Sequence, residues 1–504
     1  MPSQLSPPPP PLSPPPLPPP PHVVIFPFMA HGHTIPLLDL SKALSSKSIK
    51  VTIITTPSNT CSILPYISNL DSQNINLKQI PFPQVQDIPI GCENTSQLPS
   101  LDLFLPFLNA TKKLQPSFHQ TLKEMSQTGS LPICVISDFF LGWTLDTCRS
   151  FDVPRIVFHG MDVLSRAISK TLWVHPPHQI ITASSSTDYE FEEQSLTLPG
   201  LTLPFTLTCA DLPQSLRAPD HNDPFSEFIT EVDESDNDSW GVIVNSFVEL
   251  EHSHVAALES FYKNGAKAWC VGPLLLYNDQ LEKIDRTTKM DQCHTSKCIK
   301  WLTEQAMSAS VIYVSFGTQV HVSDAQLDEV AFGLEMSGYS YLWVVRSKTW
   351  TPPDGMEGTK KGLIISDQWV DQLSILAHRG TGGFLSHCGW NSVLESLSMG
   401  VPILAWPMIA EQSLNAKLVV EGLGAAIRVA NLGPGGVAAT VGREAICEGV
   451  KELMGGERGR SVRERTQGLG RAARRAVEEG GSSSEKLSDL IDTLCTLKKD
   501  RSHC

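Results

Sequence analysis

The chain has 504 residues, of which 41% are hydrophobic and 18% charged, so it has the composition of a globular protein and the length for two or three domains. Acidic residues outnumber basic ones by 53 to 39, which gives a formal net charge of −14. This balance argues against a protein that binds nucleic acid or an anionic membrane through basic residues, because neutralising phosphates takes Lys and Arg.

The cysteines indicate the redox environment. Twelve are scattered along the chain, and several lie within apolar runs, such as Cys134 and Cys270. This usage is typical of reduced thiols, so we expect a reducing compartment, the cytoplasm. Cys293, His294 and Cys298 have no second ligand pair at zinc spacing, and we predict no metal site. No run of 18 or more apolar residues occurs, so no membrane span is predicted.

The first 21 residues are almost all Pro, Leu and Ser. They lack the basic start and apolar centre of a signal peptide. We expect a disordered, solvated polyproline tail outside any domain. A docking site for a proline-binding domain is the alternative.

From residue 22 onward, short apolar runs alternate with helical patterns. The runs expected to be strands are 22–26, 50–55, 132–137, 155–158 and 241–245, and helical spacing occurs over 37–44 and 247–262. Near-continuous apolar runs are typical of parallel strands covered on both faces, and their alternation with helices builds a doubly wound sheet. Residues 22–273 are therefore predicted to form one α/β domain.

A polar stretch without periodicity follows, and 274–297 is predicted to be an interdomain linker. A second α/β domain is expected over 298–475, and 476–504 is expected to be a C-terminal helix packing back toward the first domain. The strands expected in the second domain are 311–316, 341–345, 362–366, 383–385 and 402–404. Two such domains place a ligand cleft between them, at the carboxyl ends of the strands.

A phosphate site is predicted within residues 369–412. Here an expected strand turns through 386–389 into a helix that opens at Trp390. A helix N-terminus presents free N–H groups and the positive end of a dipole, and both favour phosphate. His387 and Asn391 add side-chain donors at the same place.

Ser392 and Glu395 have two interpretations. Ser392 can donate to the phosphate, and Glu395, one turn further along the same helix face, can accept hydrogen bonds from a ribose diol. Alternatively the pair forms a capping box that serves only the helix.

A candidate general base follows the first strand. Thr34 is expected to be a helix N-cap and Pro36 to lie in the first turn, which puts His33 at a helix N-terminus. The positive dipole end is expected to disfavour the imidazolium and keep the ring neutral, able to take a proton from a hydroxyl. Asp138 ends another expected strand of the same domain and would orient the ring. Taken alone, His33 could equally be packed or solvated, and Asp138 a helix cap.

Residues 369–412, with their HCGWNS core and acidic-Gln ending, closely resemble the signature box of the plant family 1 UDP-glycosyltransferases. The resemblance also includes FPFMAHGHTIP, VISDFFLGW, YVSFGT and GGSSSEKL, and so extends over nearly the whole chain after residue 21. It implies the GT-B architecture, in which two Rossmann-like domains face each other. The N-terminal domain would bind the acceptor and the C-terminal domain the UDP-sugar.

The resemblance also implies a role for each matching residue. Trp369 would stack on uracil, Val370 and Gln372 would lie beside the base and ribose, and Glu395 would bind the ribose hydroxyls. The residues implied to hold the diphosphate are Thr318, His387, Asn391 and Ser392. Those implied to meet the sugar are Trp390, Glu411 and Gln412. His33 would be the general base and Asp138 its partner. Two positions depart from the commonest pattern: WAPQ is here WVDQ, and the usual Asp of the final pair is Glu411.

The implied reaction is inverting transfer of a sugar, glucose by preference, from its UDP conjugate to a hydroxyl of a small lipophilic acceptor, with flavonoids or other phenolics as the leading class. The UDP-sugar is a co-substrate, and no cofactor, nucleic acid or membrane span is implied. We expect a monomer. The alternative is a catalytically inactive nucleotide-sugar-binding protein. A dinucleotide-dependent dehydrogenase would need G-x-G-x-x-G after the first strand, where only Gly32 is present.

Overall fold

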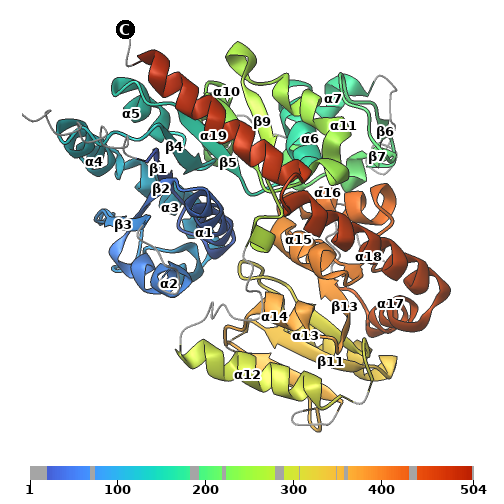
Figure 1. Cartoon of the computed structure of the whole chain (residues 1–504). Coiled ribbons are helices and arrows are strands. Elements are labelled where there is room, and N and C mark those ends of the chain that lie inside the picture. The colour runs from blue at the N-terminus through green and yellow to red at the C-terminus, as the bar shows by residue number, and fades with distance from the viewer. Residues whose placement is uncertain are drawn as a thin grey trace, which may run out of the picture.

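The computed structural model describes residues 20–67, 74–181, 192–217, 223–277, 289–305, 307–347, 349–356, 361–430 and 440–501. The predicted polyproline tail lies almost wholly outside the described residues. Two parallel sheets, each with its helices, form an N-terminal half (20–277) and a C-terminal half (289–477), as Figure 1 shows. The predicted doubly wound α/β class is confirmed.

The first sheet has seven parallel strands in the order β3-β2-β1-β4-β5-β8-β9. Their bounds are β1 His22–Phe26, β2 Lys50–Thr55, β3 Ile75–Gln79, β4 Cys134–Asp138, β5 Arg155–His159, β8 Gly241–Val244 and β9 Lys267–Cys270. The strand order reverses between the neighbours β1 and β4. The carboxyl ends of these two strands therefore form a switch point, where doubly wound sheets bind ligands.

The second sheet repeats this plan with six parallel strands in the order β12-β11-β10-β13-β14-β15. Their bounds are β10 Val311–Ser315, β11 Ser340–Val345, β12 Gly362–Ser366, β13 Thr381–Ser386, β14 Ile403–Ala405 and β15 Ala426–Arg428. Its switch point lies between β10 and β13.

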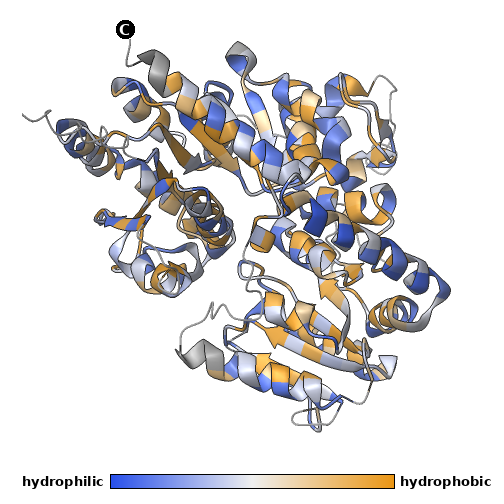
Figure 2. Ribbon diagram, viewed as in Figure 1, coloured by the Kyte–Doolittle hydropathy of each residue, from blue (hydrophilic) through white to orange (hydrophobic). Residues whose placement is uncertain are grey.

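The main helices alternate with these strands. In the N-terminal half they are α1 His31–Ser46, α2 Pro57–Ile67, α3 Phe104–Lys112, α4 Gln115–Gln127, α5 Thr144–Ser150, α6 Val163–Val174, α10 Pro224–Asn237 and α11 Val248–Glu259. In the C-terminal half they are α12 Lys289–Thr303, α13 Asp324–Ser337, α14 Gln372–Ala377, α15 Trp390–Met399, α16 Gln412–Lys417, α17 Arg443–Gly455 and α18 Glu457–Val477. In Figure 2 the strands are mostly hydrophobic and the outer helix α18 mostly hydrophilic.

Shorter elements connect them. These are α7 Pro177–Ile180, α9 Gln214–Arg217, the antiparallel pair β6 Ser195–Leu196 and β7 Leu207–Thr208, and the single turns η1 Thr95–Gln97, η2 Leu101–Leu103, η3 Cys209–Asp211, η4 Lys263–Gly265, η5 Leu274–Tyr277 and η6 Leu418–Gly422. No helix in the described ranges is both long and apolar enough to cross a membrane.

The last helix, α19 (Ser482–Arg501), packs on the N-terminal half (Figure 1). Leu487, Leu490 and Leu494 are buried in one core cluster with side chains of the first sheet. The indole N–H of Trp269 on β9 donates to Asp489 of α19 at 3.0 Å. The chain therefore returns from the second sheet to complete the core of the first.

The predicted linker at 274–297 differs from the structure at both ends. Leu274–Tyr277 form η5, and α12 begins at Lys289. α12 was missed because its first turns are polar, and among its described side chains only Cys298 and Leu302, near its end, are fully buried. We propose that the boundary between the two domains falls between η5 and α12.

Candidate active site

A cavity of about 730 Å³ lies between the two halves. The N-terminal half contributes His33, and the C-terminal half contributes every residue expected to bind the UDP-sugar. These are Thr318, Trp369, Val370, Gln372, His387, Trp390, Asn391, Ser392, Glu395, Glu411 and Gln412. Asp138 is fully buried and lies behind His33.

His33 and Asp138 meet at the first switch point. His33 lies in the first turn of α1, after β1, and Asp138 is the last residue of the neighbouring β4. The Nδ1 atom of His33 is 2.8 Å from Oδ2 of Asp138, and the other carboxylate oxygen accepts the backbone N–H of Phe140 at 3.0 Å. A carboxylate at Nδ1 holds the proton on that nitrogen and leaves Nε2 as the proton acceptor.

Helix α1 begins earlier than expected, and the prediction that Thr34 caps it is wrong. The N-cap is Ala30, and the Thr34 hydroxyl instead donates to the carbonyl of Phe28 at 3.0 Å. Pro36 therefore lies inside the helix, where it has no N–H for the carbonyl four residues earlier. That carbonyl, of Gly32, accepts the side-chain amide of Asn391 from the other half at 2.6 Å.

The pKa of His33 shifts in the direction opposite to the one expected from the helix dipole. Burial by itself lowers the pKa of His33, but the charge and hydrogen bond of Asp138, with a smaller contribution from Glu411, outweigh it. The pKa of His33 is therefore raised above its usual value. A carboxylate in direct contact has a larger effect than the partial charge of a helix end.

The phosphate turn lies at the second switch point. α15 begins after Gly389, and no side chain caps it, so the N–H groups of its first turn remain available. His387 packs against Gly317, which follows β10 and has a φ of +81°. A Cβ on Gly317 would lie 2.6 Å from Nε2 of His387. Burial lowers the pKa of His387 to about 4, so its ring is neutral near pH 7.

Ser392 and Glu395 do not form a capping box. The N-cap is Gly389, and both side chains instead accept the amide of Gln372, at 2.9 Å for Ser392 and 2.7 Å for Glu395. The hydroxyl of Tyr313 donates to the carbonyl oxygen of the same Gln372 at 3.2 Å. These side chains form a polar network on the cavity wall, where a diol could exchange hydrogen bonds with Glu395.

Trp369 is flanked by two residues whose position sequence reasoning did not foresee. The ring of His31 lies 5.1 Å from its ring at 31°, and the guanidinium of Arg346 lies 5.2 Å from it. His31 thus contacts the residue predicted to stack on uracil. Arg346 follows β11 at the carboxyl edge of the sheet, and this position could have indicated it.

Of the three residues expected at the sugar, Trp390 and Gln412 are fixed by hydrogen bonds to the backbone. The indole N–H of Trp390 donates to the carbonyl of Asn245 at 2.8 Å, so it is not free for a ligand. The side-chain carbonyl of Gln412 accepts the N–H groups of Met408 and Ile409, both at 3.0 Å, and the residue lines the cavity. Burial raises the pKa of Glu411.

Comparison with known proteins decides the family. A family model described as UDP-glucoronosyl and UDP-glucosyl transferase matches residues 285–442. The scopoletin glucosyltransferase of Nicotiana tabacum is 37% identical over 485 residues, which cover 94% of this chain and 98% of that protein. The chain belongs to the plant UDP-glycosyltransferases.

Two further proteins match this chain over nearly its whole length. The UDP-glucose flavonoid 3-O-glucosyltransferase 7 of Fragaria ananassa is 37% identical, over 94% of this chain and 96% of that one. The crystal structure of a Medicago truncatula glycosyltransferase complexed with UDP-glucose superposes with a TM-score of 0.77, at 29% identity over 94% of this chain and 98% of that one. This UDP-glycosyltransferase thus has the GT-B fold and uses a UDP-sugar as its co-substrate.

The cavity wall of this UDP-glycosyltransferase contains few cations. Among the described residues its only Lys or Arg side chains are Arg166, Lys170 and Arg346. The phosphate turn itself carries neutral donors, namely the first-turn N–H groups of α15 and His387. Within the described residues, no group of three or more His, Cys, Asp or Glu side chains could hold a metal ion.

Aromatic side chains form much of the remaining wall. Phe139 and Phe140 line the cavity, whereas Phe28, Trp143 and Phe158 are core residues. The other aromatic wall residues of the N-terminal half were missed, because their helical segments have no local pattern that separates wall from core. They are Tyr66, Phe104, Trp173 and Phe225.

Proposed function

We propose that this enzyme is an inverting O-glucosyltransferase that moves glucose from UDP-glucose to a hydroxyl of a small lipophilic acceptor, with phenolics such as flavonoids as the leading class. The observation that carries the proposal is the His33–Asp138 pair at 2.8 Å, with His33 on the same cavity wall as the nucleotide signature residues. Two relatives named as glucosyltransferases of scopoletin and of flavonoids support both the sugar and the acceptor class.

The proposed first event is proton transfer to His33. Nε2 takes the proton of the acceptor hydroxyl, and Asp138 stabilises the imidazolium that forms. The acceptor oxygen then forms a bond to the anomeric carbon while the bond from that carbon to the UDP oxygen breaks. Attack from the face opposite UDP inverts the anomeric centre, so an α-linked donor gives a β-glucoside.

UDP departs with the electron pair of the broken bond. The first-turn N–H groups of α15 and the side chains of Thr318, His387, Asn391 and Ser392 are proposed to hold the diphosphate. Preorganised donors at a helix N-terminus suit this role because they need no rearrangement as charge develops. Trp369, Val370, Gln372 and Glu395 are proposed to hold the uridine.

Preference for glucose is proposed to rest on Glu411 and Gln412. The NH2 group of Gln412 can donate to a sugar hydroxyl, whereas Glu411, when it is ionised, can only accept and repels a sugar carboxylate. Two arginines could be considered as partners for a sugar carboxylate, but both are placed elsewhere. The guanidinium of Arg346 lies over the ring of Trp369, and Arg379 of the signature box is exposed.

The proposal is tested by assaying UDP-glucose, UDP-galactose, UDP-xylose and UDP-glucuronic acid against a panel of phenolic, terpenoid and hormone acceptors. We expect UDP-glucose to give the highest kcat/KM, with a phenolic acceptor and a β-linked product. A preference for UDP-glucuronic acid would contradict the roles of Glu411 and Gln412. An α-linked product would contradict inversion.

A further inference from the structure

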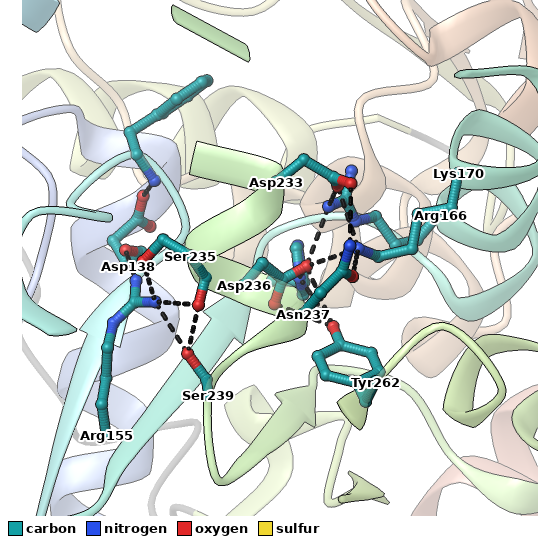
Figure 3. A network of polar contacts seen from close by, with 12 residues as sticks. Asp138, Arg155, Arg166, Lys170, Asp233, Ser235, Asp236, Asn237, Ser239 and Tyr262 are labelled. Carbon is teal, nitrogen blue, oxygen red and sulfur yellow. Dashed lines mark hydrogen bonds and ion pairs between the residues drawn. The ribbon is translucent and has the colours of Figure 1, made fainter. Parts of the chain in front are cut away.

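Four charged side chains form a cluster between α6 and α10 (Figure 3). We call Arg166, Lys170, Asp233 and Asp236 the acceptor-side charge cluster. Arg166 donates to both carboxylates, and Nζ of Lys170 lies 2.9 Å from Asp233 and 3.0 Å from Asp236. Asp236 also accepts the hydroxyl of Tyr262 at 2.9 Å. Two cations thus balance two anions.

Stability does not account for this cluster. Its side chains are only 6%, 1%, 15% and 0% exposed, in chain order, so four charges have been moved out of water. Buried ion pairs seldom stabilise a fold more than apolar residues of the same volume, because desolvation offsets their attraction. The cluster is also incompletely satisfied, since Nε of Arg166 is buried with no hydrogen-bond partner among the described residues.

The cluster lies on the wall of the catalytic cavity. Arg166, Lys170 and Asp233 line the same cavity as His33, together with the apolar side chains of Phe140 and Ile229. Asp233 is the most exposed member. Burial alone raises the pKa of Asp233, but Arg166 and Lys170 outweigh it and hold that pKa below its usual value. The cavity wall therefore includes the ionised carboxylate of Asp233, which can only accept hydrogen bonds.

We infer that Asp233 accepts a hydrogen bond from a second hydroxyl of the acceptor, distinct from the hydroxyl that receives the sugar. The acceptor class is then neutral and apolar, with two hydroxyl groups. A carboxylate in place of the second hydroxyl is disfavoured, because Asp233 repels it and both cations are already paired. This inference rests on the proposed function, because it places the acceptor in the N-terminal part of the cavity.

Three stilbenes test the inference without any variant. They share a 4-hydroxyl and carry a hydroxyl, a methoxy or a carboxylate group at the 4′ position. With saturating UDP present, calorimetry should show that the diol binds about 10- to 100-fold more tightly than the methyl ether, as expected for a hydrogen bond to a charged group, and that the carboxylate is no better than the ether. Equal affinities for diol and ether, or no binding of the diol, would overturn the inference.

Asp233→Asn adds a test of the residue itself. The diol should lose most of its advantage over the ether, and the carboxylate should bind more tightly, because the cluster gains one net positive charge. Asp238→Asn is the matched control. It lies at the end of the same helix and pairs with Arg149 and Lys263, but is not on the cavity wall. The control should retain the wild-type ranking, and thermal melting of both variants checks that they fold.

The two proposals fail differently. Wild-type enzyme that ranks the three stilbenes as expected but transfers glucose to none of them contradicts the proposed phenolic acceptor, and the role of Asp233 stands. Enzyme that transfers glucose to the diol, with the same ranking in wild type and Asp233→Asn, contradicts the role of Asp233 alone.

Discussion

The pKa of the proposed base, His33, is set by two opposing effects: burial lowers it and Asp138 raises it. Its neutral form takes the proton, so kcat/KM should rise with pH through a pKa above the usual histidine value. Asp138→Asn removes the charge and leaves burial, which lowers the pKa of His33. The inflection of the pH profile should therefore move to lower pH, with a lower plateau. An unmoved inflection would show that another group titrates.

The proposed stacking of Trp369 on uracil can be tested by measuring UDP affinity. Trp369→Ala should weaken UDP binding by about 1–3 kcal/mol, as for aromatic stacking on bases, measured by calorimetry. His31→Ala is the control, because His31 contacts the ring of Trp369 but is not among the residues proposed to bind uridine. It should leave UDP affinity unchanged or tighter. Equal weakening in both variants would instead make His31 part of the nucleotide site.

Among the elements, the turn after β10, which contains Gly317, packs against the turn after β13, which contains His387. Gly317→Ala combines a positive φ with a Cβ 2.6 Å from His387, so it should lower the melting temperature and weaken UDP binding by about tenfold or more. Gly338→Ala shares the positive φ, at +84°, but its Cβ would meet open space. This control should cost about 1–2 kcal/mol of stability and leave UDP affinity intact.

The sequence predicted the inner strands of both sheets and the edge strand β12, and it missed the other edge strands, β3, β9 and β15. β1, β4 and β10 are continuous apolar runs, whereas β3 (INLKQ) alternates with polar residues and β15 has three residues. His387, Asn391, Ser392 and Glu395 could be predicted because they are local to one strand–turn–helix, whereas the roles of Trp369, Glu411 and Gln412 were implied only by the family resemblance. The charge cluster could not, because its members come from α6 and α10, far apart in the sequence.

For the whole molecule, α19 ties the end of the chain to the first sheet. Leu490→Ala removes a fully buried side chain from that core and should lower the free energy of unfolding by about 2–5 kcal/mol. Thr496→Ala on the exposed side of the same helix should change it by less than about 0.5 kcal/mol. UDP affinity should be unchanged in both, since the proposed nucleotide residues belong to the other half. Weaker UDP binding in Leu490→Ala would show that the halves do not act independently.

The central claim is that His33, on one half, activates the acceptor while the other half holds the donor. Turnover of His33→Ala with UDP-glucose and an accepted phenolic, measured together with calorimetric UDP affinity, tests it most directly. We predict that turnover falls by about 10²–10⁴-fold while UDP affinity stays within a few fold of wild type. Turnover within a few fold of wild type would contradict the claim.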